Sequence, residues 1–172
     1  VLDFIDDGID VAIRAGRLPD SSLYARRIGP AHRVYCASPA YIARRGRPKH
    51  PIDLAEHECV VMVLGDATPA TSNRWHFEGP DGRFDVPVSG RLRVNSIEMA
   101  RVLALQGRGV TMLPLVAAVE HLRAGHLETV LDPFLPTGEA VYAVYPSNRH
   151  APAVLRAIID LLVDTFADQK LV

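Results

Sequence analysis

The feature of this sequence that most constrains its fold is a strand-like run followed directly by a complete set of helix signals. Residues 33–37, RVYCA, form a short apolar run typical of a strand. Ser38 suits a helix N-cap, Pro39 suits the first helical position, and Gly46 suits the position just after the helix. The pattern therefore predicts a strand over 33–37 and a helix over 39–45.

The order of strand and then helix recurs along the rest of the chain. Ile9, Val11 and Ile13 alternate with polar or small residues, which predicts a strand over 9–14. Short runs of apolar residues predict further strands over 23–27, 59–63, 91–94, 110–113 and 141–145. Apolar residues at helical spacing and cap signals predict helices over 1–7, 95–106, 115–124 and 154–166, with Asn95 as the N-cap of the second.

Two further patterns refine the fold class. Residues 75–78 and 83–86 alternate on either side of the turn 79–82, Gly-Pro-Asp-Gly, and predict a hairpin. Residues 141–145 are continuously apolar, which is typical of a strand inside a parallel sheet. Because strands alternate with helices, we expect an α/β fold with mostly parallel sheets.

Two strand-to-helix corners are the candidate binding features. Ser38 and the pair Asn95-Ser96 each end a predicted strand and begin a predicted helix. In open α/β sheets, ligands collect beyond the carboxyl ends of the strands, and the unpaired N–H groups of a helix start attract carboxylate or phosphate. We expect both corners to face one cleft for a small polar or anionic molecule. The alternative, that both are ordinary caps serving only stability, stays open.

Size, charge and cysteine content narrow the class of protein. A length of 172 residues suits one domain folded as two lobes, and a net charge of −1 argues against a general nucleic-acid binder. No apolar run approaches the ~18 residues that cross a bilayer, and acidic residues near Val1 do not resemble a signal peptide. Cys36 and Cys59 lie in apolar runs and predict buried free thiols in a reducing compartment.

The sequence carries no recognisable catalytic or metal-binding motif. It contains no Gly-x-Ser-x-Gly, His-Glu-x-x-His or Cys-x-x-Cys. His50, His57 and Cys59 cluster without a known metal spacing, so we interpret the histidines as solvated loop residues. The basic run over 44–49 is interpreted as a solvated helix end. We therefore expect no catalytic residue, no metal and no cofactor.

Four segments together resemble the effector-binding domain of LysR-type transcriptional regulators. The resemblance runs from Phe4 to about Asp168, and the order of the SPAY, GRGVTMLP and VYPSNRH motifs is specific. The segments are FIDDGIDVAIRAGRLPDSSLYARRIG, RVYCASPAYIARRGRPKHPIDLAEHECV, GRLRVNSIEMARVLALQGRGVTMLP and AVYAVYPSNRHAPAVLRAIIDLLV.

The resemblance implies a fold like the type II periplasmic binding proteins, with two α/β lobes and an effector in the cleft between them. It implies that lobe one is 1–27 plus 136–172, lobe two is 34–126, and the crossings are 28–33 and 127–135. By position it implies that the effector contacts Arg14, Ala15 and Gly16 from lobe one, and Ser38, Pro39, Asn95, Ser96, Leu113 and Pro114 from lobe two.

The chain departs from the family pattern at its start. It lacks the N-terminal helix-turn-helix, the linker helix, and the first strand, first helix and second strand of lobe one, so we expect a truncated piece of a longer regulator. The strand over 9–14 would then lack its usual partners. We expect lobe one to be incomplete, and either poorly ordered or completed by strands from a second copy.

The function that the resemblance implies is control of transcription by a small-molecule effector. It implies a cytoplasmic, bacterial, homo-oligomeric parent protein that contacts DNA only through the missing helix-turn-helix and does not contact a membrane. Two alternatives share the scaffold: a periplasmic solute-binding receptor domain, and an enzyme. The first would need a signal peptide upstream, and the second a positioned base or nucleophile, which the sequence does not reveal.

Overall fold

A computed structural model describes residues 9–16, 18, 23–63, 72–146 and 153–167. The chain divides into two compact units. Unit 1 comprises Val1–His32 and Gly138–Val172, and unit 2 comprises Arg33–Thr137. The helix predicted over 1–7 lies outside the described residues.

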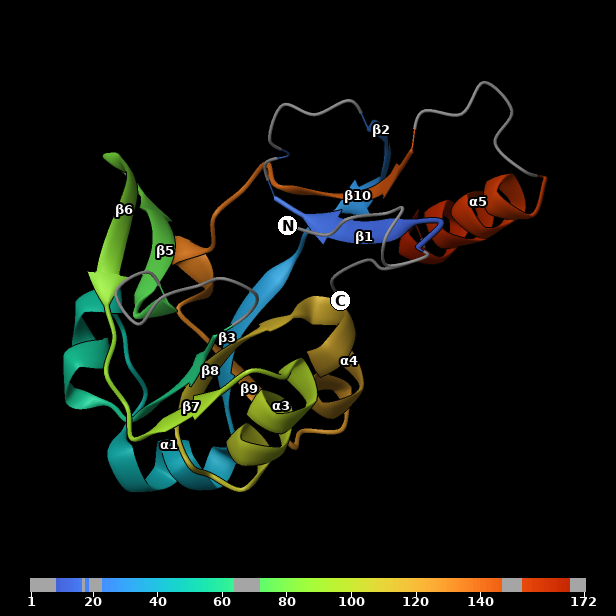
Figure 1. The fold of residues 1–172 in the computed structure, drawn as a ribbon. Coiled ribbons are helices and arrows are strands. Elements are labelled where there is room, and N and C mark those ends of the chain that lie inside the picture. Colours follow the sequence, from blue (N-terminus) through green and yellow to red (C-terminus); the bar gives the residue numbers. More distant parts are fainter. Residues whose placement is uncertain (1–8, 17, 19–22, 64–71, 147–152, 168–172) are drawn as a thin grey trace. The chain divides into compact units, whose positions relative to one another are not determined.

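Unit 1 is a three-stranded sheet covered on one face by a helix. The helix α5, Ala153–Ala167, has the apolar spacing that the sequence predicts, and it places Leu155 and Ile159 against the sheet. The buried residues that they meet are Ile28, Val141 and Ala143. In spatial order, the strands are β1 (Ala12–Ala15), β10 (Ala140–Tyr145) and β2 (Tyr24–Pro30) (Figure 1).

The strand β1 has a partner within this chain. It pairs antiparallel with β10, so that Ala12 lies opposite Val144 and Ala15 lies opposite Val141. β1 is nevertheless the outer strand of this sheet, so the expectation that it lacks its usual partners stays a prediction. A central strand such as β10 offers hydrogen-bonding groups along two edges, and β1 takes one edge while β2 takes the other.

Unit 2 is built on a five-stranded sheet. Two helices, α3 (Ile97–Leu105) and α4 (Leu115–Arg123), lie next to each other and bury Ala100, Ala104 and Ala118 against the sheet (Figure 1). In spatial order, the strands are β7 (Leu92–Val94), β4 (Cys59–Met62), β8 (Val110–Pro114), β3 (Arg33–Ala37) and β9 (Glu128–Val130).

The remaining elements of unit 2 pack as the sequence predicts, with one addition. The helix α1, Pro39–Arg45, and the hairpin of β5 (Arg74–Gly79) and β6 (Gly82–Pro87) are confirmed. The hairpin buries Phe77 against Tyr35, with ring centroids 4.6 Å apart. Two 3₁₀ helices, Pro51–Glu56 and Asp132–Phe134, are additional to the prediction.

The α/β class is confirmed, but the expectation of mostly parallel sheets is wrong. Among the strand pairs described, only β4 with β7 and β4 with β8 are parallel. Both neighbours of β3 are antiparallel to it, and β10 is antiparallel to both of its own neighbours. A continuous apolar run indicates that a strand is buried on both faces of its sheet. It does not determine whether the strand runs parallel or antiparallel to its neighbours.

The sheets also extend into the segments expected to be crossings. β2 continues through Pro30, and Gly29 lies opposite Val141. β9 is paired with β3, with Val130 opposite Tyr35. Residues 28–30 therefore belong to the sheet of unit 1 and residues 128–130 to the sheet of unit 2, because each has a strand partner there.

Candidate functional site

The structure separates the two corners that the sequence analysis placed together. Cys36 lies opposite Thr111, so Ser38 follows at the end of the sheet where β4 and β8 begin. Asn95 follows Val94, which pairs with the last residue of β4, at the end where β4 and β8 finish. The two corners are separated by the length of a strand, about 13 Å. The expectation of a shared corner is wrong because β3 runs against β4, β7 and β8.

Ser38 has the structural role of a helix cap. Its side chain accepts a hydrogen bond from the backbone N–H of Tyr41 at 3.3 Å, and the residue is 3% exposed. A Cβ atom placed on Gly107 would lie only 3.3 Å from Ser38 Oγ, so the turn after α3 packs closely over this hydroxyl. Pro39 is exposed in the first turn of α1, at the same end of the sheet.

The other corner is the start of α3, where the N-cap differs from the prediction. Ser96, and not Asn95, is the cap, and its side chain accepts from the N–H of Met99 at 3.4 Å. Both residue types are good caps, so composition alone does not decide between adjacent positions. Asn95 is exposed just before the cap. The other N–H groups of this first turn have no acceptor within the helix, which makes the helix end electropositive.

A second helix begins at the same end of the sheet. β8 runs parallel to β4, and α4 starts directly after Pro114. Pro114 occupies the N-cap position without any side-chain cap hydrogen bond, and α3 and α4 are in contact. The two helix starts that share an end of unit 2 are therefore those of α3 and α4. The sequence predicts this helix over 115–124, but without a cap at its start, because proline is not an N-cap signal. Pro114 was named through the family resemblance alone.

Leu113 does not form the expected apolar wall of this site. Its side chain is 0% exposed and belongs to the core cluster that contains Val34 and Ala100. Pro114 is half-buried and follows it at the end of the strand. Alternation along β8 directs Leu113 into the core, so Asn95, Ser96 and Pro114 are the predicted residues that reach the surface at this end.

Arg14, Ala15 and Gly16 belong to unit 1 and follow one another at the carboxyl end of β1. Arg14 is half-buried and lies opposite Tyr142 of β10. Gly16 has a φ of 91°, which favours glycine, and its N–H donates to the carbonyl oxygen of Ala140 at 2.9 Å. The amide of Gly16 is therefore already satisfied, and Arg14 is the group of this trio that can supply a positive charge.

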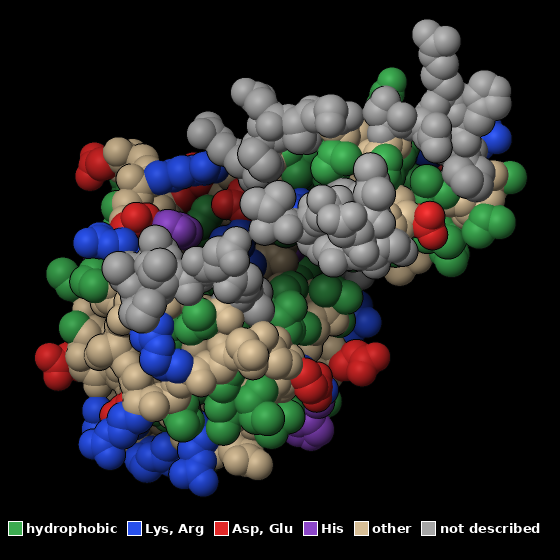
Figure 2. Space-filling view, viewed as in Figure 1, with side chains coloured by type: hydrophobic (Ala, Val, Ile, Leu, Met, Phe, Trp, Pro, Cys, Tyr) green, Lys and Arg blue, Asp and Glu red, His purple; other side chains and the backbone are tan. Residues whose placement is uncertain are grey.

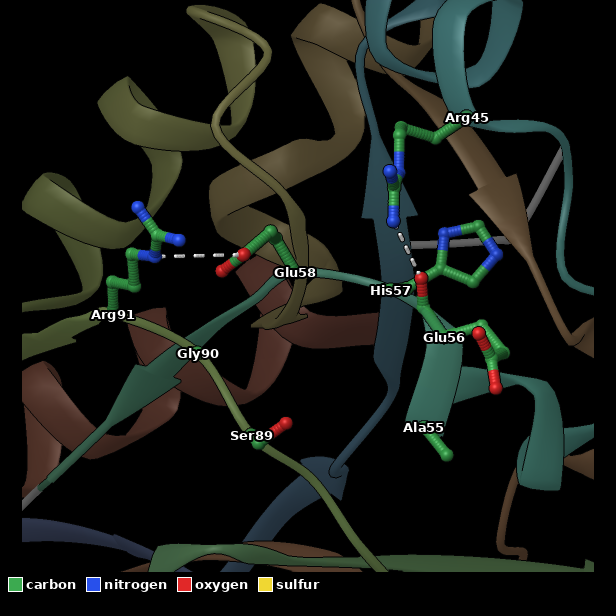
Figure 3. A pocket seen from close by; sticks show the side chains of 8 residues that line it. All are labelled: Arg45, Ala55, Glu56, His57, Glu58, Ser89, Gly90 and Arg91. Atoms are coloured by element: carbon green, nitrogen blue, oxygen red, sulfur yellow. Dashed lines mark hydrogen bonds and ion pairs between the residues drawn. The ribbon is translucent and has the colours of Figure 1, made fainter.

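The opposite end of unit 2, next to α1, contains a pocket that the sequence analysis did not identify. Its volume is about 500 Å³, and Figure 3 shows the side chains that line it. His57, at its edge, is 9% exposed, and its Nδ1 lies 3.1 Å from the hydroxyl oxygen of Tyr41, so the expectation of a solvated histidine is wrong. Burial, followed by the charge of Arg45, lowers the pKa of His57. The lining residues are Arg45, Ala55, Glu56, His57, Glu58, Ser89, Gly90 and Arg91.

The sequence predicts that both cysteines are buried free thiols, and the structure describes both residues. Cys36 and Cys59 are buried free thiols, and burial raises the pKa of each to about 12. No group of three His, Cys, Asp or Glu residues that could hold a metal ion occurs among the described residues. Across the same residues, no helix is both long enough and apolar enough to span a bilayer.

Two units of sheet and helix, one of which brings two helix starts to one end, make this a two-unit α/β domain. The LysR substrate binding domain family matches residues 1–167. The chain is 35% identical over 167 residues to the probable HTH-type transcriptional regulator LtrA of Klebsiella pneumoniae, with 95% of this chain and 53% of that protein covered. The chain belongs to the LysR substrate-binding domain family.

Solved structures agree with this assignment. The LysR-type regulator CrgA of Neisseria meningitidis matches with a TM-score of 0.81 and 29% identity, covering 96% of this chain and 55% of that one. The separate CrgA regulatory domain matches with a TM-score of 0.79 and 28% identity, covering 96% of this chain and 81% of that one. The two-lobed fold class is thereby confirmed. The chain spans about half the length of the curated relatives that it matches.

Proposed function

We propose that the effector of this domain is a small polar or anionic metabolite, and that it binds at the end of unit 2 where α3 and α4 begin. The observation that carries this proposal is the pair of helix starts after two parallel-running strands. Their first-turn N–H groups and helix dipoles favour carboxylate or phosphate. Asn95 adds an exposed side-chain amide that can both donate and accept hydrogen bonds.

We propose Arg14, with Ala15 and Gly16 beside it, as effector-binding residues of unit 1 considered by itself. Support comes from the family assignment and from the place of these residues at the carboxyl end of β1. Ser38 and Pro39 are not included, because they lie at the other end of unit 2. Leu113 is not included because its side chain is in the core.

The experiment that tests this site is a thermal-shift screen of small carboxylates and aromatic acids. A compound at 100-fold its dissociation constant stabilises the folded protein by about 2.7 kcal/mol. Asn95→Val removes the amide without removing the cap of α3, and we expect it to abolish the shift. Ser38→Ala is the matched control: it costs about 1 kcal/mol of stability as a lost cap and leaves the ligand-induced shift unchanged. A shift that survives in Asn95→Val would place the site elsewhere.

We also propose that the domain acts within a longer regulator of transcription in the cytoplasm, as a homo-oligomer that contacts DNA through a separate helix-turn-helix part. The names of the relatives support this reading. LtrA of Klebsiella pneumoniae is named a probable HTH-type transcriptional regulator, and DmlR of Escherichia coli (strain K12) an HTH-type transcriptional regulator. This chain alone should not retard operator DNA in a mobility-shift assay at moderate salt. Sequence-specific retardation by this chain would contradict the proposal.

The proposed role is ligand binding without chemical conversion. The matched relatives are regulators, which favours this role over both the enzyme and the solute receptor. After prolonged incubation with any compound found in the screen, we expect the compound to be recovered unchanged by mass spectrometry. Conversion that depends on the protein would establish an enzymatic role instead.

A further inference from the structure

The pocket beside α1 is distinct from the proposed effector site. Ser89, Gly90 and Arg91 line the pocket and lead directly into β7, and α3 begins after β7 ends. β7 contains three residues, which span about 10 Å of extended chain. The pocket and the start of α3 therefore lie at opposite ends of the same strand.

The floor of the pocket is tightly packed backbone around Glu58. A Cβ atom at Gly90 would lie 1.7 Å from the carbonyl oxygen of Cys59, and one at Gly109 would lie 2.4 Å from that of Glu58. The N–H of Glu58 donates to the hydroxyl oxygen of the buried Tyr41 at 3.0 Å. Only glycines fit against this backbone, so the floor is formed before any ligand binds.

One side of the pocket carries a positive charge. The guanidinium of Arg45 donates to the backbone carbonyl oxygen of Glu56 at 2.9 Å, and within the described residues it has no ion pair with a carboxylate. His57 next to it is neutral near pH 7, because burial and Arg45 lower its pKa. Figure 2 shows further Lys and Arg side chains gathered over the α1 end of unit 2. Glu56 also lines this side, and Figure 3 shows its side chain directed away from the Arg45 guanidinium. The guanidinium is therefore available to a carboxylate.

The facing side of the pocket carries a negative charge that is weakly neutralised. Glu58 Oε1 lies 3.9 Å from Nε of Arg91, and the side chains are 46% and 91% exposed, respectively. A pair at this distance and exposure contributes little, so the carboxylate of Glu58 can accept a hydrogen bond from another cation. Figure 3 shows this pair on the opposite side of the pocket from Arg45 and His57.

We propose that this pocket binds a small zwitterion of the amino-acid type, with its carboxylate at Arg45 and its ammonium group at Glu58. The lining contains two arginines and two glutamates, so a ligand with both charges finds a partner for each. An anion would lie near Glu56 and Glu58, and a cation near the two arginines, so an ion with one sign of charge would meet like charges. The volume of about 500 Å³ lies within the range of small-molecule sites.

The test is isothermal titration calorimetry of the protein with the zwitterions glycine and L-glutamine. Acetate and methylammonium serve as probes that carry a single charge each. We expect saturable binding of a zwitterion and none of either single-charge probe. Arg45→Gln and Glu58→Gln each remove one charged hydrogen bond and should weaken binding at least about tenfold. Arg108→Gln is the matched control, since Arg108 is exposed and does not line the pocket.

Each other result overturns the inference. The pocket is not such a site if neither amino acid binds saturably into the millimolar range, or if affinity survives in both Arg45→Gln and Glu58→Gln. Circular dichroism melts establish that each variant is folded, and two independent variants guard against misfolding of one. Binding that is lost in Asn95→Val alone would assign the amino acid to the proposed effector site, which contradicts this inference and supports the proposed function.

Discussion

Replacement of Tyr41 by phenylalanine tests the packing of unit 2 around its α1 end. Tyr41 is 1% exposed, and its hydroxyl oxygen accepts from the N–H of Glu58 at 3.0 Å. The same hydroxyl lies 3.1 Å from Nδ1 of His57 and 3.3 Å from the carbonyl oxygen of Glu58. Phenylalanine keeps the ring and its packing but removes all of these contacts.

The expected loss follows from the hydrogen bonds that disappear. The hydroxyl accepts one hydrogen bond and donates one, and each is worth about 1 kcal/mol net. The free energy of unfolding of Tyr41→Phe should therefore be about 2 kcal/mol lower than that of the wild type. With a denaturant slope of about 2 kcal/mol per molar urea, the unfolding midpoint falls by about 1 M.

The assay is urea unfolding followed by tryptophan fluorescence. Trp75 is the one tryptophan of the sequence, is 5% exposed and lies in unit 2, so it reports on the unit that contains Tyr41. Tyr24→Phe serves as the control, because Tyr24 is 57% exposed and belongs to unit 1. A midpoint for Tyr41→Phe equal to that of the wild type would refute the hydrogen-bond argument.

Three further predictions concern the same end of unit 2. Gly90→Ala places a methyl group 1.7 Å from the carbonyl oxygen of Cys59, and should destabilise the fold by about 3 kcal/mol or more, measured by urea unfolding. Burial, and after it the charge of Arg45, lower the pKa of His57 in the folded state. The neutral imidazole therefore contributes to the free energy of unfolding above the unfolded-state pKa of about 6.5, and this contribution is lost as the pH falls through the lower folded-state pKa. Unfolding free energies at pH 7.5 and 5.5 should differ more in the wild type than in His57→Gln. Because burial raises the pKa of Cys36 and Cys59 to about 12, a thiol reagent at pH 8 should label them only after unfolding, and rapid labelling of the folded protein would contradict their burial.

Local elements were predictable from the sequence because their signals are local. The helix Pro39–Arg45 has its cap and its terminal glycine within the segment itself, and Gly46 has the positive φ of 84° that the prediction requires. Likewise, the turn at 79–82 lies directly between the two strands of the hairpin and sets which of their residues pair. In both cases the residues that set the conformation are neighbours along the chain.

The candidate site was only partly predictable, because it depends on strand direction. Asn95 and Ser96 were identified correctly as a strand-to-helix corner, but Ser38 was placed beside them. The direction of β3 is set by its pairing with β8, more than seventy residues along the chain, and apolar runs look the same in either direction. Pro114, at the start of α4, was named only through the family resemblance, because proline gives no cap signal.

The pocket beside α1 was missed because its residues come from three separate segments. Arg45 belongs to a basic run that was interpreted as a solvated helix end, and Arg91 lies in a loop before β7. The close approach of Gly90 to the Cys59 backbone and the hydrogen bond from Arg45 to the carbonyl oxygen of Glu56 bring these segments together. Glycines that precede a strand are a weak signal of such close approach.

The central claim is that the effector binds where α3 and α4 begin, and amide NMR tests it most directly. The protein is titrated with the compound that gives the largest thermal shift in the screen, and the backbone N–H signals are followed. We predict the largest shifts at Ile97, Glu98 and Val116, in the first turns of these two helices, and no change at Ala40 and Tyr41 of α1. Shifts confined to Ala40 and Tyr41, with the first turns of α3 and α4 unaffected, would contradict the account.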